Sequence, residues 1–197
     1  MELKDAILKR RSIRKFSDVE VSEEEIKELL IAGMAAPSAV NKKPWEFYVI
    51  KSKEKLEELR KHGAPFGKMN APLAIVVCGN KHRFLPFKMS EFWVQDCSAA
   101  TENILLRAVD LGLGACWCGV YPNDLAVKST RKVIEAKDNI IPLNVIWIGH
   151  GTEEKEERSQ FEGKYIHTLW NNKMKLKKIV FKFLFLCFCK KVFTFVK

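Results

Sequence analysis

The stretch "LAIVVC" (73–78) is a continuous run of apolar residues in the middle part of the chain. A strand with one face in water alternates apolar and polar residues, so an unbroken run predicts a strand buried on both faces. Two other segments, "EFYVI" (46–50) and "LNVIWIG" (143–149), also have the composition of strands. We therefore expect a β-sheet with at least one strand that is covered on both sides.

Segments with helical periodicity separate these strands. Ser22 and Glu25 form a capping box, which predicts the start of a helix that ends near Pro37. The other helices are expected over residues 2–10, 53–61, 91–111 and 123–131. The stretches 81–90 and 114–122 are assigned no regular element. Strands that alternate with helices indicate one layered domain, α/β or α+β.

The positive charge of the chain is unevenly distributed. The 197 residues have a formal net charge of +10, but residues 171–197 hold eight lysines and no acidic residue. The other 170 residues carry 26 cations against 24 acids, so the body of the protein is nearly neutral. A general polyanion field is therefore not a property of the body, and we expect no nucleic-acid partner.

The cysteines favour a cytoplasmic protein with reduced thiols. Six cysteines, at 78, 97, 116, 118, 187 and 189, show no spacing typical of secreted proteins. Residues 1–15 are too charged for the apolar run of a signal peptide. Cys116 and Cys118 are separated by one residue rather than two and have no histidine nearby, so we expect no metal site.

The stretch "KRRSIRKF" (9–16) places five cations around Ser12. It is compatible with a nucleic-acid patch, with the solvated basic end of a helix, and with a site for one phosphate-bearing ligand. If the chain is extended after residue 10, side chains alternate, and Arg10, Ser12 and Arg14 share one side. Two guanidinium groups with a hydroxyl between them suit a phosphate or a polyol.

A second stretch, "AAPSAVNKKPWEF" (35–47), places Pro37, Ser38 and Asn41 in a loop between a helix and a strand. Small residues there expose backbone groups to a flat partner, and loops held by rigid elements often carry binding function. The alternative is an ordinary connection with a buried Trp45.

Four stretches occur in order along the chain: "RRSIRKF", "APSAVNKKPWEF", "LGLGACWCGVYP" and "WIGHGTEEKEERSQF". Together they resemble the nitroreductase family of flavin enzymes, over about residues 1–170. The resemblance implies an α+β fold with a mixed central β-sheet flanked by helices. It also implies an interlocked homodimer that holds two FMN molecules at the subunit interface.

The same resemblance implies the cofactor-binding residues. The FMN phosphate, ribityl chain and pyrimidine edge would be held by Arg10, Arg11, Ser12 and Arg14. The isoalloxazine ring would be lined by Pro37, Ser38 and Asn41 of the partner subunit. Cys118 and Gly119 would lie near the N5 edge of the ring, where the backbone of Cys118 rather than its thiol can be what matters. Arg158 would return to the phosphate.

The chain departs from the family pattern at two places. Lys43 precedes Pro44 where family members commonly carry Gln. Two acids precede Arg158 where family members tend toward a Lys-Pro-Arg-like run. Carboxylates beside a phosphate are unfavourable unless they point to solvent, and Lys155 would compensate for them.

The resemblance implies an FMN-dependent oxidoreductase. NAD(P)H would deliver hydride to the flavin N5, and a nitroaromatic, quinone or similar small acceptor would then use the same open face, in a ping-pong mechanism. No protein nucleophile or general acid is required, so no catalytic side chain is assigned. Four aromatic residues are candidates either for the acceptor-side wall or for the packing of a long loop: Phe84, Phe87, Phe92 and Trp93.

Two other functions stay open at this point. A flavin enzyme of the same fold can act as an FMN reductase, a dehalogenase-like enzyme or a ferredoxin-linked reductase, because acceptor choice lies in variable loops. The other is a protein that binds nucleic acid or a membrane through its basic tail, and such a protein would purify without colour.

Residues 171–197 are interpreted as a basic, hydrophobic tail that follows an FMN-binding domain of residues 1–170. The apolar centre of the tail, "IVFKFLFLCFC" (179–189), is eleven residues long and contains a lysine, whereas a transmembrane helix needs about 20 apolar residues. The tail is therefore not expected to span a bilayer. A membrane-surface anchor, extra dimer contacts and a dispensable extension are three interpretations, and we expect the last.

Overall fold

The computed structural model describes residues 1–63, 69–158 and 160–169. The chain divides into two units, Met1–Ser159 and Gln160–Lys197, each considered by itself. In the second unit, the described residues contain one turn of 3-10 helix, Gly163–Tyr165. The predicted tail, residues 171–197, lies outside the described residues. No helix within the described residues is long and apolar enough to cross a membrane.

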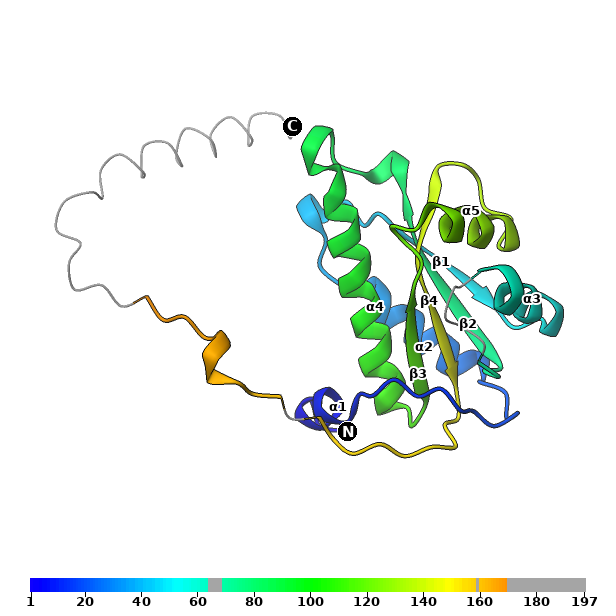
Figure 1. Ribbon diagram of the computed structural model, residues 1–197, viewed down its shortest axis with the longest axis vertical. Helices are drawn as coiled ribbons and strands as arrows, with labels where there is room; N and C mark the ends of the chain where they lie inside the picture. The colour runs from blue at the N-terminus through cyan, green and yellow to red at the C-terminus, as the bar shows by residue number, and fades with distance from the viewer. Residues whose placement is uncertain (64–68, 159, 170–197) are drawn as a thin grey trace. The chain divides into compact units, whose positions relative to one another are not determined.

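The first unit contains five helices and four strands among its described residues (Figure 1). In chain order these are α1 (Leu3–Lys9), α2 (Glu23–Met34), β1 (Trp45–Ile50), α3 (Lys53–Glu58), β2 (Leu73–Asn80), α4 (Phe92–Asp110), β3 (Gly114–Gly119), α5 (Asp124–Val133) and β4 (Ile140–Gly149). Short 3-10 helices cover Ala39–Asn41, Lys81–Arg83 and Phe87–Glu91, and a π-helical turn, Leu59–Gly63, continues α3. The expected helices are all present, although α3 is shorter than its periodicity indicated.

The four strands form one antiparallel sheet in the order β1-β2-β4-β3. The expectation of a mixed sheet is therefore wrong for these strands. The helix α4 carries the chain from β2 to β3, which run in the same direction, but β4 lies between them and runs the opposite way. Every neighbouring pair of these strands is antiparallel as a result, and the parallel bridge between Ser12 and Ala115 lies outside the named strands.

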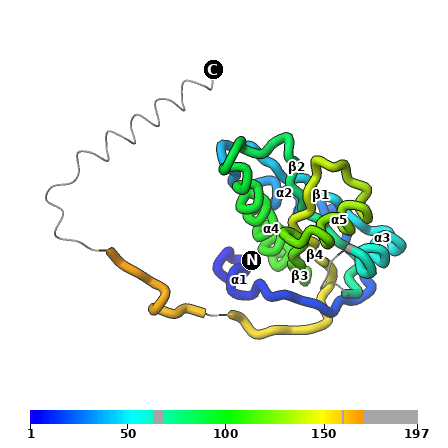
Figure 2. Tube along the Cα trace, turned by 45° about the horizontal axis from the view of Figure 1, so that its top comes forward, coloured from blue at the N-terminus to red at the C-terminus, as the bar shows by residue number. Residues whose placement is uncertain are grey.

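The sheet is buried on both faces, as the run 73–78 predicted. Every residue of β2 is buried. Ile75 and Val77 pack with the helices α2 and α4, whereas Val76 and Cys78 pack with α3 and α5. Figure 2 shows the sheet between these two pairs of helices. Burial of each large side chain contributes about 1.5–3 kcal/mol, so the two-sided core holds the three layers together.

The start of α2 follows from its sequence. The Ser22 side chain accepts a hydrogen bond from the Glu25 amide at 3.2 Å, and the Glu25 carboxylate accepts one from the Ser22 amide at 2.8 Å. These contacts satisfy the backbone amides of Glu25 and Ser22, which the start of a helix otherwise leaves without partners. The predicted capping box is confirmed.

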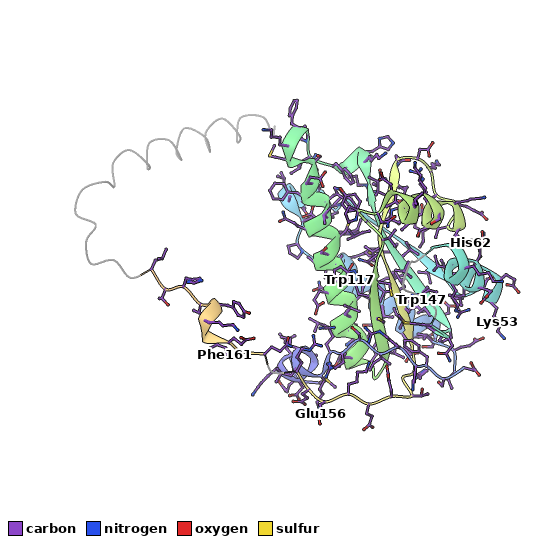
Figure 3. All side chains as sticks on the ribbon, in the orientation of Figure 1. Lys53, His62, Trp117, Trp147, Glu156 and Phe161 are labelled. Atoms are coloured by element: carbon purple, nitrogen blue, oxygen red, sulfur yellow. The ribbon has the colours of Figure 1, made fainter. Side chains whose placement is uncertain are left out.

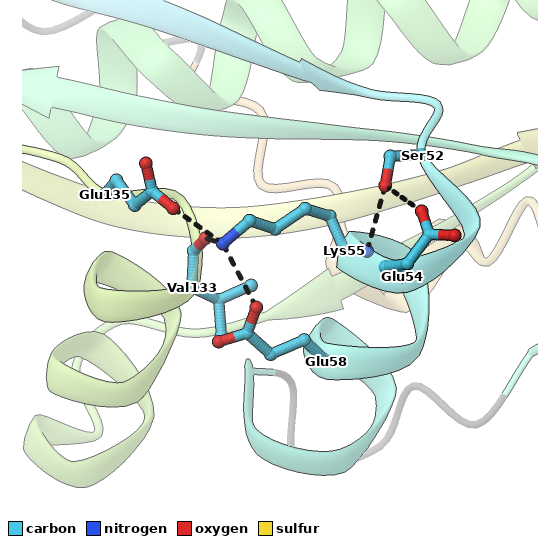
Figure 4. A network of polar contacts seen from close by, with 6 residues as sticks. All are labelled: Ser52, Glu54, Lys55, Glu58, Val133 and Glu135. Carbon is cyan, nitrogen blue, oxygen red and sulfur yellow. Dashed lines mark hydrogen bonds and ion pairs between the residues drawn. The ribbon is translucent and has the colours of Figure 1, made fainter.

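The two helices on the α3 side are joined by one lysine (Figure 4). The Lys55 ammonium donates to Glu58 at 3.1 Å, to the Val133 carbonyl at 3.2 Å and to Glu135 at 2.8 Å. The Ser52 side chain caps α3 by accepting from the Lys55 amide. Exposed ion pairs of this kind contribute only about 0–1 kcal/mol each. They fix where α3 meets the end of α5, while burial supplies most of the stability.

The strand β3 is a feature that the sequence did not predict. Residues 114–119 are short and bounded by glycines, and their strand conformation depends on pairing with β4, from Gly114 opposite Gly149 to Gly119 opposite Asn144. Trp117 on β3 packs on the α4 side of the sheet, and Trp147 on β4 is fully buried on the other side (Figure 3). The strand β3 is an edge of the sheet, and the N-terminal segment lies beside it.

Candidate functional site

The N-terminal segment, residues 8–16, is fixed between β3 and the segment 150–158. The Ile13 amide donates to the Ala115 carbonyl at 3.0 Å, which attaches the segment to β3. The Thr152 amide donates to the Lys15 carbonyl at 3.0 Å, and the Arg158 amide donates to the Leu8 carbonyl at 3.1 Å. The first and last sequence blocks therefore meet in one place.

Charged groups surround the backbone of Ser12. The Lys155 ammonium donates to the Ser12 carbonyl at 2.6 Å, and the Arg14 guanidinium donates to the same oxygen at 3.3 Å. Glu153 accepts from the Arg14 amide at 2.6 Å and pairs with Lys155 at 3.0 Å. These bonds hold the pKa of the Glu153 carboxyl below its usual range. The carboxylate offsets part of the positive charge, holds the Lys155 ammonium and fixes the backbone of Arg14.

The two arginines before Ser12 have other neighbours. The Arg10 guanidinium pairs with Glu102 of α4 at 3.2 Å. Arg11 donates to the backbone carbonyl of Glu156, whose position on the segment below α1 is labelled in Figure 3. Arg10 is the C-cap of α1, and its φ of −59° and ψ of 113° show that the backbone has already left the helical conformation there. Burial raises the pKa of Glu102, and Arg10 counteracts that effect only in part.

Two thiols lie on the face of β3 that these cations approach. Cys116 and Cys118 are both buried and point to the same side, because alternate residues of a strand share a face. A hydrogen bond from Cys118, helped by the positive charges of Arg14 and Lys155, lowers the pKa of Cys116 to about 7 despite its burial. The same contact and burial raise the pKa of Cys118. The lowered pKa of Cys116 thus reflects first its contact with Cys118 and then the positive charges beside Ser12.

The end of β3 presents open backbone. Gly119 is exposed, and a methyl group added at its Cα would meet nothing within 4 Å. Opposite Gly119 on β4, the Asn144 side chain is buried and donates to the Thr101 hydroxyl at 2.9 Å. A flat molecule can therefore approach the backbone here without a side chain in the way.

The loop with Pro37, Ser38 and Asn41 lies near the start of α4. The buried Asp96 carboxylate accepts the Ala39 amide at 2.9 Å, and the Ser38 hydroxyl accepts the Lys43 amide at 2.9 Å. Val40, Asn41 and Lys43 have φ values of 51°, 54° and 47°. Such left-handed residues cost about 1–3 kcal/mol each, so the loop keeps its shape through these anchors.

Within a single chain, this loop and the cations around Ser12 contact different parts of α4. The loop is attached to α4 at Asp96, whereas Arg10 reaches Glu102 and the N-terminal amino group reaches Asp110 at the far end of α4. Within the described residues, no hydrogen bond or ion pair joins the loop to residues 10–14. This separation is compatible with the expectation that the loop serves a second subunit.

Two of the four candidate aromatic residues are packing residues. Phe84 stacks on Trp93 with ring centres 5.2 Å apart, and Trp93 contacts Tyr121 edge-on at 5.0 Å. Trp93 is buried, whereas Phe87 is 90% exposed and Phe92 39% exposed. Only the latter two are available to contact a ligand or a partner.

Sequence reasoning identified most of the cluster but gave Lys155 only a compensating role. The structure places this lysine in direct contact with Ser12, and the signal for it was the basic residue that interrupts the acidic run 153–157. Arg158 contributes its backbone amide to the contact with α1, and its side chain is exposed, so its phosphate contact stays a prediction. Among the described residues, no group of three His, Cys, Asp or Glu side chains is arranged to hold a metal ion.

The chemistry of this donor set suits an anionic ligand with a flat part. Arg14, Lys155 and the more distant Arg10 and Arg11 offer positive charge, and Ser12 offers a hydroxyl. The open backbone of Gly119 offers a surface for a ring.

The sequence matches the model of the nitroreductase family over residues 7–66 and 63–150. A relative from Methanothermobacter thermautotrophicus, provisionally named NADH dehydrogenase/NAD(P)H nitroreductase, is 44% identical over 169 residues, which are 85% of this chain and 86% of the relative.

Solved structures that resemble this chain are also named nitroreductases. An FMN-dependent nitroreductase from Clostridium difficile is 35% identical, with a TM-score of 0.74 over 84% of this chain and 98% of the other. A protein from Desulfovibrio desulfuricans, provisionally named a nitroreductase and crystallised in complex with FMN, is 25% identical, with a TM-score of 0.72 over 87% of this chain and 99% of the other.

Proposed function

The chain belongs to the nitroreductase family, and from this premise we propose that it binds FMN and uses NAD(P)H to reduce small acceptors such as nitroaromatics and quinones. The observation that carries the proposal is the cluster around Ser12, where Arg14 and Lys155 supply positive charge to a hydroxyl-bearing backbone segment. This donor set fits the phosphate and polar edge of FMN. The family relatives support the assignment of the cofactor through their names.

Bound FMN would supply hydride acceptance and hydride delivery. The residues of the chain bind and orient it. Arg10, Arg11, Ser12 and Arg14, together with Lys155 and Arg158, would hold its phosphate, ribityl chain and pyrimidine edge. Arg14 would also stabilise negative charge on that edge. Cys118 and Gly119 would offer backbone to the reacting side of the ring, where the open space beside Gly119 leaves room.

One open face of the ring would be used in turn by NAD(P)H and by the acceptor, which gives a ping-pong mechanism. The proposal requires no side chain as nucleophile or general acid. Trp93, which is buried, and Phe84, which is partly buried and stacks on it, would support this region from the side of the core.

We also propose that the active form is a homodimer. Several large apolar side chains on α1, α2 and the following loop are more than half exposed in the single chain: Leu3, Ile7, Ile31, Met34 and Val40. A second copy would cover such a surface. Pro37, Ser38 and Asn41 of one copy would then line the ring bound to the other copy, which explains why they do not meet the cations of their own chain.

The test is the visible spectrum of the purified full chain. We expect a yellow protein that releases about one FMN per chain on denaturation, has a dimeric mass by light scattering, and oxidises NAD(P)H when menadione or nitrofurazone is added. A colourless monomer that takes up no added FMN would overturn the proposal.

A further inference from the structure

One end of the sheet carries five exposed cations: Lys42, Lys43, Lys81, Arg83 and Lys88, here called the basic end. Printed contacts bring their segments together. The Arg83 guanidinium donates to the Lys43 carbonyl at 3.2 Å, and the Asn80 amide donates to the Pro44 carbonyl at 2.8 Å. The cations therefore come from two segments, 42–43 and 81–88, that meet where β1 begins and β2 ends.

The charge of the basic end is not neutralised by the chain. Within the described ranges, none of the five cations forms an ion pair with a carboxylate. Three carboxylates of adjoining segments have other partners: Glu46 accepts from Asn80, Glu91 from Tyr121, and Asp138 pairs with Arg131. The Lys81 ammonium donates to the backbone carbonyl of Asp138 at 3.1 Å, which carries no formal charge. Since residues 1–170 carry 26 cations against 24 acids, this concentration of charge is local rather than general.

An aromatic side chain projects from the same segment. Phe87 lies between Arg83 and Lys88 in the sequence, is 90% exposed, and has a φ of 57°. Left-handed backbone is unfavourable for a bulky residue, and an exposed phenyl ring gains nothing from burial. Phe84 of the same segment is instead stacked in the core. Phe87 is thus exposed on a segment that also carries Arg83 and Lys88, and a flat ring system can stack on it.

The basic end is connected to the loop proposed to line the flavin. The Lys43 amide donates to the Ser38 hydroxyl at 2.9 Å, and the Lys43 carbonyl accepts from Arg83. Ser38 and Arg83 are therefore linked through one residue. The basic end therefore adjoins the loop that is proposed to line the ring.

We propose that the basic end binds the adenosine 2′-phosphate half of NADPH, with the 2′-phosphate against Arg83 and Lys43 and the adenine stacked on Phe87. The inference rests on the proposed function and assigns its preferred reductant. An arginine fork matches a phosphate, and NADH lacks the 2′-phosphate, so the cations would select between the two dinucleotides. Five cations on a nearly neutral body suit one small anion better than a long polyanion.

The experiment uses the FMN-loaded full chain. We expect kcat/KM for NADPH to exceed that for NADH about tenfold or more, because each lost charge-assisted contact changes affinity by about tenfold or more. The double variant Lys43→Gln/Arg83→Gln should lose that advantage and change kcat/KM for NADH less than about twofold. Phe87→Ala should lower kcat/KM for both dinucleotides, and Phe87→Tyr should restore both.

A binding measurement separates recognition from turnover. Adenosine 2′,5′-bisphosphate should bind the wild type in a calorimetric titration, more weakly as salt rises from about 50 to about 200 mM, and the double variant should bind it at least about tenfold more weakly. Lys53→Gln is the matched control, because Lys53 is an exposed lysine at the start of α3, outside both the basic end and the proposed dimer surface. It should behave as the wild type.

Equal kcat/KM for the two dinucleotides, or a double variant with unchanged preference, would overturn the inference while the flavin enzyme stands. Displacement of the bisphosphate by single-stranded DNA with a higher affinity than NADPH would also overturn it, in favour of a polyanion surface. A chain that binds no FMN would instead refute the proposed function.

Discussion

The Lys155 ammonium lies 2.6 Å from the backbone carbonyl oxygen of Ser12, although the two residues are 143 positions apart in the sequence. Half-buried and paired with Glu153, the lysine connects the segment after β4 to the segment after α1. This contact fixes the position of one positive charge beside β3. A half-buried ammonium interacts more strongly with a nearby anion than one in open water does.

Replacing Lys155 with Met should weaken FMN binding about ten- to hundredfold, since a charge-assisted hydrogen bond contributes about 1.5–3 kcal/mol. The quenching of FMN fluorescence on binding measures the change. Lys155→Arg should recover most of the affinity, and Lys61→Met, which removes an exposed lysine of the π-helical turn after α3, should have no effect. Equal affinities of Lys155→Met and the wild type would show that the lysine does not serve the site.

Arg14→Ala should also weaken FMN binding by roughly 1.5–3 kcal/mol and slow reduction by NAD(P)H. Lys15→Ala should change neither, because Arg14 lies beside Ser12 and the Cys116 thiol, whereas Lys15 alternates to the other side of the segment. Stopped-flow absorbance follows the reduction. The two variants behaving alike would contradict the assigned geometry.

Two glycines offer a test that separates stability from binding. A methyl group at Gly79 would clash with the Trp93 ring and lie 2.9 Å from Phe84, so Gly79→Ala should lower the free energy of unfolding by about 1–3 kcal/mol. A methyl group at Gly119 meets no atom within 4 Å, so Gly119→Ala should keep the melting temperature but lower FMN affinity. A Gly119→Ala protein with normal FMN affinity would remove this glycine from the site.

Cys116 should titrate with a pKa of about 7, which the rise in ultraviolet thiolate absorbance of the flavin-free protein measures against Cys116→Ser. Cys118→Ala should move the midpoint upward, because the hydrogen bond from Cys118 is the largest cause of the shift. Since the native pKa is lowered, this thiol stabilises the fold most above the usual thiol pKa of 9.0 and loses that contribution as pH falls through about 7. A midpoint near 9 in the wild type would contradict the contact between the two thiols and the charges placed around them.

Truncation after Asn172 should retain FMN and NAD(P)H oxidation and improve solubility. The buried residues of the two hydrophobic clusters that the structure describes lie between Phe16 and Ile148, and we expect this core to be sufficient for the fold. The FMN content and the mass of the truncated chain are the measurements. Loss of flavin or of the dimer would make the tail part of the fold.

Local patterns predicted the elements well because their causes are local. The unbroken apolar run 73–78 required burial on both faces, and Ser22 with Glu25 determined the start of α2. What failed depended on contacts across the chain. Residues 114–119 form a strand because they pair with β4. The sequences of β2 and β3 contain no pattern that predicts β4 between them.

The candidate site divides in the same way. The cations of residues 10–14 could be recognised from their spacing around Ser12, since one short segment carries them. The roles of Lys155 and Glu153 depend on a contact over more than a hundred residues. Sequence reasoning therefore identified the charges near the N-terminus, gave Lys155 only a compensating role and did not identify Glu153.

The central position of β4 has a consequence for folding during synthesis on the ribosome. The strand β4, which lies between β2 and β3 in the sheet, is the last of the four to be translated. At about 5–20 residues per second, several seconds pass between the emergence of β2 and that of β4. During that interval β2 offers a long apolar edge with no neighbour, which is a template for pairing with other nascent chains. We expect chaperone demand to be concentrated in this interval.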